Sequence, residues 1–242
     1  MRRADDSAQA ARLTGCAVMR MFATLLRAFL EARVLALGAA LVFSGCSVLS
    51  PKQDRTRFIL LTPATAGASN RTHLAASPNL TTVAIGLGPV QLPGYLDRPE
   101  LVIRTSPNGF ELSEMSRWAE PLADNFRHVL ANDLTNLLGT TNIVQYPWYP
   151  ETRLDYIVHI EIQRFEADTS HNAQLVAHWD LRTPQSNQVL ASREAQFSSP
   201  LTSLMGDAAA AALSQDVAAL ARQIASAIAQ AEQRRIAIIE GQ

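Results

Sequence analysis

The sequence predicts a single-domain α+β sandwich, in which a mostly antiparallel sheet carries two main helices on one face. Residues 154–162 and 174–182 alternate apolar and polar side chains. This alternation is typical of strands with one buried and one solvated face, and such strands usually pair antiparallel. Residues 121–138 and 203–235 instead repeat apolar side chains every three or four positions, which predicts amphipathic helices.

The first predicted elements are strands separated by turns and loops. Residues 57–63 (RFILLTP) predict a short strand that proline ends. Residues 64–79 are rich in Ala, Ser, Thr and Asn and predict a loop. Residues 81–93 begin with apolar side chains at every second position, which predicts a strand. The two glycines and the proline within residues 86–89 are expected to bend or end this strand.

A hairpin and the first helix come next. Residues 101–104 predict a strand, Pro-Asn-Gly at 107–109 predicts a turn, and residues 110–112 predict the returning strand. The helix at 121–138 has a proline in its first turn and is followed by Gly139, as helix ends prefer.

The second half of the domain is predicted to contain three strands and the second helix. Residues 143–148 form a short extended segment, and residues 189–197 form a weaker third strand after the two alternating ones. The helix at 203–235 is alanine-rich, which favours helix formation and close packing. Its predicted apolar stripe consists of Leu213, Val217, Leu220, Ile224 and Ile228. The apolar tail at 236–239 is compatible with a helix end, a segment that packs back, or a contact with a neighbour.

The N-terminal region has the pattern of a bacterial lipoprotein signal. Arginines precede an apolar run at 34–43, which is too short to span a bilayer, and the run leads into Ser44-Gly45-Cys46. This end resembles a lipobox, although Phe43 stands where leucine is usual. We therefore expect residues 1–45 to be a removed signal peptide and the Cys46 thiol to be acylated. The alternative is an ordinary signal with an incidental cysteine, and Met19 and Met21 are plausible alternative translation starts.

We expect the remaining chain to divide into a lipidated tether at 46–56 and a folded domain at 57–242. Residues 1–45 hold six of the 21 basic and three of the 22 acidic residues, so residues 46–242 carry a net charge of −4. This balance, without basic clusters, argues against a nucleic-acid partner. Cys46 is the only cysteine in this part, so it contains no internal disulfide.

The sequence offers little evidence of catalysis. It contains no HExxH, CxxC or GxSxG motif, so we expect no enzyme, no resident metal and no cofactor other than the acyl chains on Cys46. The one pattern that could hold a metal is His159 and Glu161 on one strand with His178 and Asp180 on the next. The simpler interpretation is a solvated polar face.

Two kinds of segment are candidates for partner binding because aromatic side chains lie beside charges and prolines in predicted loops. The candidate residues are Tyr95, Leu96, Asp97, Arg98, Arg117, Trp118, Tyr146 and Trp148. The alternative is that these aromatics close the open ends of the sandwich, with Arg98 or Arg117 capping carbonyl groups.

The run VAIGLGPVQLPGYLDRPELVIR at 83–104 resembles the ABC-type transport auxiliary lipoproteins, which include the paraquat-inducible protein C family. Further matches are RWAEPL at 117–122, NDLTNLLG at 132–139, YPW at 146–148 and the strand at 155–166. The resemblance covers nearly all of the domain.

The resemblance implies an accessory role and no catalysis. Such a protein is expected on the periplasmic face of the outer membrane, held in the bilayer through Cys46, and Ser47 after the cysteine fits outer-membrane sorting in enteric lipoproteins. Its expected partner is an MCE-domain periplasmic protein of an inner-membrane transport system that moves lipids between membranes. One hypothesis is an adaptor that docks the MCE assembly, with a ring-like homo-oligomer. The alternative is a lipid-binding module that shelters an acyl chain near Leu220 and Ile224.

Overall fold

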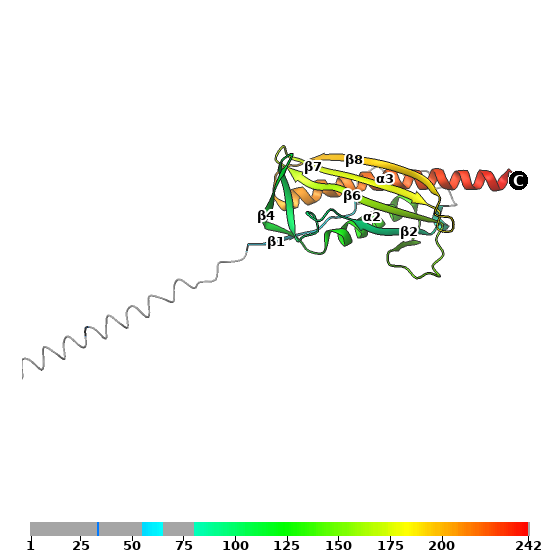
Figure 1. Cartoon of the computed structure of the whole chain (residues 1–242), viewed down its shortest axis with the longest axis horizontal. Coiled ribbons are helices and arrows are strands. Elements are labelled where there is room, and N and C mark those ends of the chain that lie inside the picture. The colour runs from blue at the N-terminus through cyan, green and yellow to red at the C-terminus, as the bar shows by residue number, and fades with distance from the viewer. Residues whose placement is uncertain (1–32, 34–54, 65–79, 242) are drawn as a thin grey trace, which may run out of the picture. The chain divides into compact units, whose positions relative to one another are not determined.

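An eight-stranded mixed sheet with two helices packed on it builds the domain (Figure 1). The computed structural model describes residues 33, 55–64 and 80–241. Apart from Arg33, the predicted signal peptide lies outside the described residues, as do Cys46, most of the tether and residues 65–79 of the predicted loop. Residues 55–242 form one compact unit. No helix in the described part of the chain is long and apolar enough to cross a membrane.

The strands follow one another along the chain as β1 (Arg57–Ile59), β2 (Ile85–Gln91), β3 (Glu100–Ser106), β4 (Gly109–Trp118), β5 (Ile143–Gln145), β6 (Tyr156–Asp168), β7 (Asn172–Arg182) and β8 (Val189–Pro200). The helices are the short 3-10 turn η2 (Leu80–Thr82), α2 (Leu122–Leu138) and α3 (Gly206–Glu240).

The strand β6 is the centre of the sheet. One of its edges pairs antiparallel with β7, which in turn pairs antiparallel with β8. Its other edge is shared, because β2 pairs parallel with the first half of β6 and β3 pairs parallel with its last residues. The strand β5 extends the sheet beyond β2, while β4 and then β1 extend it beyond β3.

The predicted α+β class is confirmed, and the longest pairings are antiparallel as expected. Four pairings among the described strands are nevertheless parallel, which the alternation pattern did not indicate. The reason is connectivity, because α2 lies between β2 and β6 in the chain and crosses over the sheet between them.

Both helices lie on one face of the sheet, as predicted (Figure 1). α3 packs on β6, β7 and β8, while α2 packs on β2 and β5 and against α3. All five residues of the predicted α3 stripe are completely buried. They meet the inward side chains of β7, which are Leu175, Ala177, Trp179 and Leu181 and are also completely buried.

Two elements extend further than the sequence predicted, whereas β2 bends as expected. β2 shifts register between Leu87 and Val90 and continues to Gln91. Gly88 permits this path, because a Cβ there would lie 3.1 Å from the carbonyl oxygen of Val158. β4 reaches Trp118, so part of the predicted loop is strand. α3 continues to Glu240, so the apolar tail at 236–239 is the end of the helix.

The chain after β1 is held along the two helices through its backbone. Two side chains of α2 and one of α3 accept hydrogen bonds from three backbone N–H groups of residues 61–64. The bonds are Leu61 N–H to Asn125 Oδ1 (2.7 Å), Thr62 N–H to Ser214 Oγ (3.1 Å) and Ala64 N–H to Asp133 Oδ1 (2.8 Å). This arrangement forms one wall of the pocket described below.

Candidate functional site

The structure brings two of the predicted partner-binding segments together. The backbone N–H of Trp118 donates to the carbonyl oxygen of Pro99 at 2.7 Å, and Arg117 lies opposite Glu100 across the β3–β4 pairing. The Arg117 guanidinium is 3.9 Å from the Glu100 carboxylate. The YLDRP and RWAEP segments therefore form one corner of the domain.

Tyr95 anchors this corner to the end of β6 through a buried carboxylate. Its hydroxyl donates to Glu166 Oε2 at 2.7 Å, and its ring stacks on Phe110 with 5.5 Å between centroids. Glu166 is fully buried and also accepts hydrogen bonds from the guanidinium groups of Arg104 and Arg164. Four side chains thus form one ion-paired cluster that fixes the segment before β3.

The electrostatics of the cluster follow from these contacts. Burial raises the pKa of Tyr95 to about 12, and the Glu166 carboxylate that accepts its hydrogen bond adds to this rise. Burial alone would raise the pKa of Glu166, but hydrogen bonds from Arg104, Tyr95 and Arg164 outweigh it and lower that pKa. The lowered pKa of Glu166 keeps its carboxylate ionised at neutral pH, where it holds Tyr95, Arg104 and Arg164 together.

Burial corrects part of the predicted partner surface. Leu96 is 2% exposed and Trp118 is 5% exposed, so both belong to the core and the interpretation as exposed loop residues was wrong for them. Asp97 is exposed, and Arg117 has an exposed side chain at the end of β4. Arg98 is half-buried, and its Nε has no hydrogen-bond partner among the described residues. Partner binding by these three charged residues stays a prediction.

The third predicted segment lies at the opposite end of β6. The rings of Tyr146 and Trp148 pack edge to face with 5.5 Å between centroids. Trp148 also packs against Gly86, where a Cβ would lie 3.2 Å from the ring and 2.7 Å from the Cδ1 of Leu154. Ten residues of β6 separate Tyr156 from Glu166, a distance of about 33 Å in a strand. The predicted candidates therefore divide between two ends of the domain.

This second end also exposes Tyr149, which was not among the predicted partner-binding residues. Tyr149 is 80% exposed and Tyr146 is 46% exposed, whereas Trp148 is half-buried. Tyr149 lies between two prolines in the same QYPWYP run, so the run itself was the available signal. We call residues 146–149 the aromatic loop.

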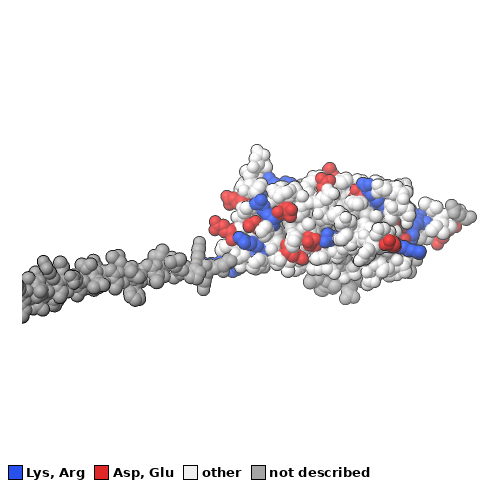
Figure 2. All heavy atoms as spheres, turned by 60° about the horizontal axis from the view of Figure 1, so that its bottom comes forward, with Lys and Arg blue, Asp and Glu red and all other residues white. Residues whose placement is uncertain are grey.

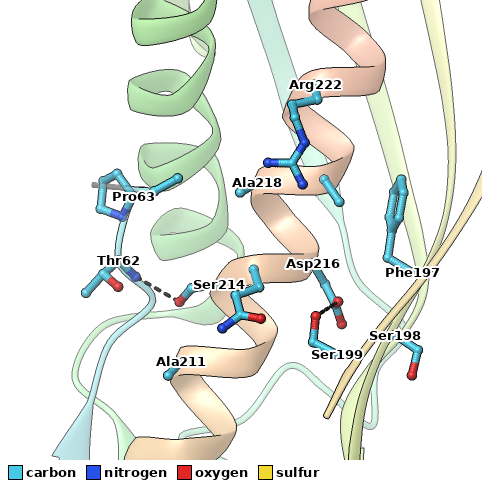
Figure 3. Close-up of a pocket in the computed structure, with 13 residues that line it drawn as sticks. Thr62, Pro63, Phe197, Ser198, Ser199, Ala211, Ser214, Asp216, Ala218 and Arg222 are labelled. Atoms are coloured by element: carbon cyan, nitrogen blue, oxygen red, sulfur yellow. Dashed lines mark hydrogen bonds between the residues drawn. The ribbon is translucent and has the colours of Figure 1, made fainter. Parts of the chain in front are cut away.

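A pocket of about 490 Å³ lies between α3, β8 and the segment after β1 (Figure 3). Phe197 and Ser199 line it from β8, while Asp216 and Arg222 line it from α3. Figure 3 shows the Ser199 hydroxyl donating to Asp216 Oδ1, at a distance of 2.6 Å. The residues that line the pocket include no histidine, cysteine or lysine.

Two buried carboxyl groups beside this pocket were not singled out from the sequence. Asp216 is 1% exposed and Asp133 is 3% exposed, and the Oδ2 atom of each has no hydrogen-bond partner among the described residues. Burial raises the pKa of Asp216 to about 6, against the opposing effect of the Ser199 hydrogen bond. Burial likewise raises the pKa of Asp133 to about 6, and the hydrogen bond from Ala64 and the charge of Arg222 oppose this rise. A signal existed for Asp216, because it interrupts the apolar stripe between Leu213 and Leu220.

The polar residues considered for a metal do lie opposite one another across β6 and β7. His159 pairs with Asp180, and Glu161 pairs with His178. However, Asp180 is held by two bonds from the Arg182 guanidinium, at 2.5 and 3.0 Å. No group of three or more metal-ligating side chains occurs in the part of the chain that the structure describes. His159 and Glu161 are exposed, as the simpler interpretation expects, whereas Asp180 is buried at 8% exposed.

Charged side chains of both signs are mixed on the molecular face drawn in Figure 2, without an extended patch of one sign.

Comparison with known proteins identifies relatives of this fold. The family model described as ABC-type transport auxiliary lipoprotein component matches residues 63–225. A solved Xanthomonas campestris protein of the family DUF330 is 18% identical with a TM-score of 0.55, covering 74% of this chain and 97% of its own. An uncharacterized protein of known structure is 19% identical with a TM-score of 0.54, covering 60% of this chain and 92% of its own. At these identities the structures share the fold alone. No curated protein matches the sequence.

Proposed function

This chain belongs to the ABC-type transport auxiliary lipoprotein family, and from that premise we propose that it is a non-catalytic accessory component of an MCE/ABC-type intermembrane lipid transport system. In this proposal acyl chains on Cys46 hold the domain on the periplasmic face of the outer membrane. The domain then docks the MCE assembly to that membrane.

The observation that carries the proposal is the separation of two ends within one compact domain. The tether enters at β1, beside the corner formed by β3 and β4. The aromatic loop lies at the other end of β6, about 33 Å away along the strand. An anchor at one end and exposed aromatic side chains at the other are the features that an adaptor needs.

We assign docking of the partner to the aromatic loop in preference to the YLDRP corner. Exposed tyrosine side chains present a large, amphipathic contact area and are enriched where proteins bind one another. Tyr146 and Tyr149 offer such area, whereas Leu96 and Trp118 are already used in the core.

The alternative of an acyl-chain shelter beneath α3 has less support. Leu220 and Ile224, which were expected to line it, are completely buried against the sheet. An acyl chain at that position requires α3 to move away from a close-packed core, at the cost of those contacts.

The test is purification of the tagged, full-length protein from membranes in mild detergent, followed by mass spectrometry of proteins and lipids. We expect an MCE-domain protein in stoichiometric amount, and acyl chains on Cys46. A protein that carries bound phospholipid without any protein partner would contradict docking and favour the lipid-binding alternative.

A further inference from the structure

The outward face of β1 and β4 exposes large apolar side chains. Side chains alternate along residues 58–61, so that Ile59 and Leu61 are buried while Phe58 and Leu60 point outward. Phe58 is 69% exposed and Leu60 is 45% exposed. Phe58 is paired with Arg117 of β4.

The neighbouring strand adds to the same face. Met115 precedes Arg117 by two residues in β4 and therefore points to the same side of the sheet. It is 56% exposed. Because β1 has only three residues and forms an end of the sheet, its outward face is left uncovered by the described part of the domain. We call Phe58, Leu60 and Met115 the β1 face.

The chain upstream limits where this face can be. Only nine positions separate Cys46 from Arg55, the first described residue of the domain. A fully extended chain of that length spans about 30 Å. If Cys46 is acylated, β1 is the first described strand of the chain after the lipid anchor. The β1 face therefore stays within about 30 Å of the bilayer.

We propose that the β1 face rests on the lipid surface into which the acyl chains of Cys46 insert. This inference rests on the acylation that is part of the proposed function, and it adds a second membrane contact made by the folded domain itself.

The composition of the β1 face and its surroundings fits a membrane interface. Aromatic and aliphatic side chains enter the boundary between headgroups and acyl chains, while arginine guanidinium groups remain at the level of the phosphates. Arg117 lies opposite Phe58 in the pairing of β1 with β4 and is therefore on the same face. Its ion pair with Glu100 is long, at 3.9 Å, and its side chain is 46% exposed. Such a pair contributes little, so the Arg117 guanidinium is free to exchange partners with a lipid phosphate.

The size of the β1 face favours lipid over a protein partner. A stable protein interface uses roughly 20–30 residues on each side. Three apolar side chains are far fewer, but they suffice at a lipid surface because the acyl anchor already holds them there. The contact is expected to orient the domain on the membrane, while the acyl anchor retains it there. In this orientation the β1 face lies on the lipid surface and the aromatic loop projects away from it.

Fluorescence quenching tests the contact in full-length, acylated protein reconstituted in vesicles of phosphatidylethanolamine with a minor fraction of phosphatidylglycerol. Single cysteines replace Phe58, Met115 or, as the matched exposed control, Tyr149, and each carries an environment-sensitive fluorophore. Acylation blocks the Cys46 thiol, so only the introduced cysteine reacts. We expect doxyl-labelled lipid to quench the labels at 58 and 115 several-fold more than the label at 149, and aqueous iodide to give the reverse order.

Two results would overturn the inference. Labels at 58 and 115 that iodide quenches as strongly as the label at 149 would place the β1 face in water. Labels protected from both quenchers would indicate a protein cover, such as a second copy. The mass of the protein distinguishes the two proposals: missing acyl chains contradict the proposed function itself, whereas acylated protein with unprotected labels contradicts the membrane contact alone.

A double variant provides a second, independent measurement. Phe58→Ser with Met115→Ser removes two side chains that the fold leaves mostly exposed, at 69% and 56%, so thermal stability and acylation are expected to change little. Energy transfer from a label at position 149 to a bilayer dye is expected to give a broader distance distribution than in the parent protein. An unchanged distribution would contradict an orienting role of the β1 face.

Discussion

The carboxyl group of Asp216 should make the stability of the domain depend on pH. Burial raises its pKa from 3.8 to about 6, because the side chain is 1% exposed and its Oδ2 has no partner among the described residues. The folded protein therefore binds this proton more tightly than the unfolded chain. The resulting stabilisation is fully present below pH 3.8 and is lost as the pH rises through 6.

The magnitude follows from the size of the shift. About two pKa units at 1.36 kcal/mol each amount to about 3 kcal/mol of unfolding free energy, lost between roughly pH 4 and pH 6. Asp216→Asn removes this titration and keeps an oxygen that can accept from Ser199. We expect the unfolding free energy of the variant, relative to that of wild type, to be about 3 kcal/mol higher at pH 7 than at pH 4.

Chemical denaturation at a series of pH values measures this difference. Asp207→Asn is the matched control, because Asp207 lies in the first turn of the same helix with a 73% exposed side chain. A plot of its unfolding free energy against pH is expected to run parallel to the wild-type plot. If the Asp216→Asn curve also runs parallel to wild type within about 0.5 kcal/mol, the reasoning about the buried carboxyl group is refuted.

Three further changes have expected outcomes. Cys46→Ala should abolish acylation and release the processed protein from the membrane or leave its precursor unprocessed; normal retention in a fractionation assay would contradict the lipoprotein assignment. Tyr95→Phe removes a hydrogen bond to the ionised Glu166 and should lower the unfolding free energy by about 1.5–3 kcal/mol; an unchanged denaturation midpoint would mean that the cluster does not hold this segment. Tyr149→Ala should leave thermal stability unchanged and reduce co-purification of the MCE-domain protein, whereas Asp97→Arg, at the other end of the domain, should reduce it less; the opposite order would assign docking to the YLDRP corner.

Elements governed by local periodicity could be predicted from the sequence. The stripe from Leu213 to Ile228, the alternation along β6 and β7, and Gly139 after α2, where φ is 71°, all follow from repeats within a few residues. The same reasoning correctly placed the hairpin turn between β3 and β4.

Features governed by distant contacts could not be predicted. Alternation with a period of two does not reveal which strands are neighbours in the sheet. The sequence therefore did not predict that β2 and β3 each pair parallel with β6, along the same edge. Trp118 looked exposed because charges and prolines surround it in sequence, yet β1 covers it across a separation of about sixty residues. The three hydrogen-bond partners of Glu166 could not be predicted, because two of them, Tyr95 and Arg104, lie far from it in the chain.

Site-specific photocrosslinking in intact cells tests the central claim, that the domain links the outer membrane to an MCE assembly, most directly. A photoreactive amino acid replaces Tyr149 in one variant and Asp97 in another, both of which are exposed. The account predicts an adduct with an MCE-domain protein from at least one position, and more of it from position 149. Adducts from both positions that contain only lipid or a second copy of this chain would contradict the adaptor function.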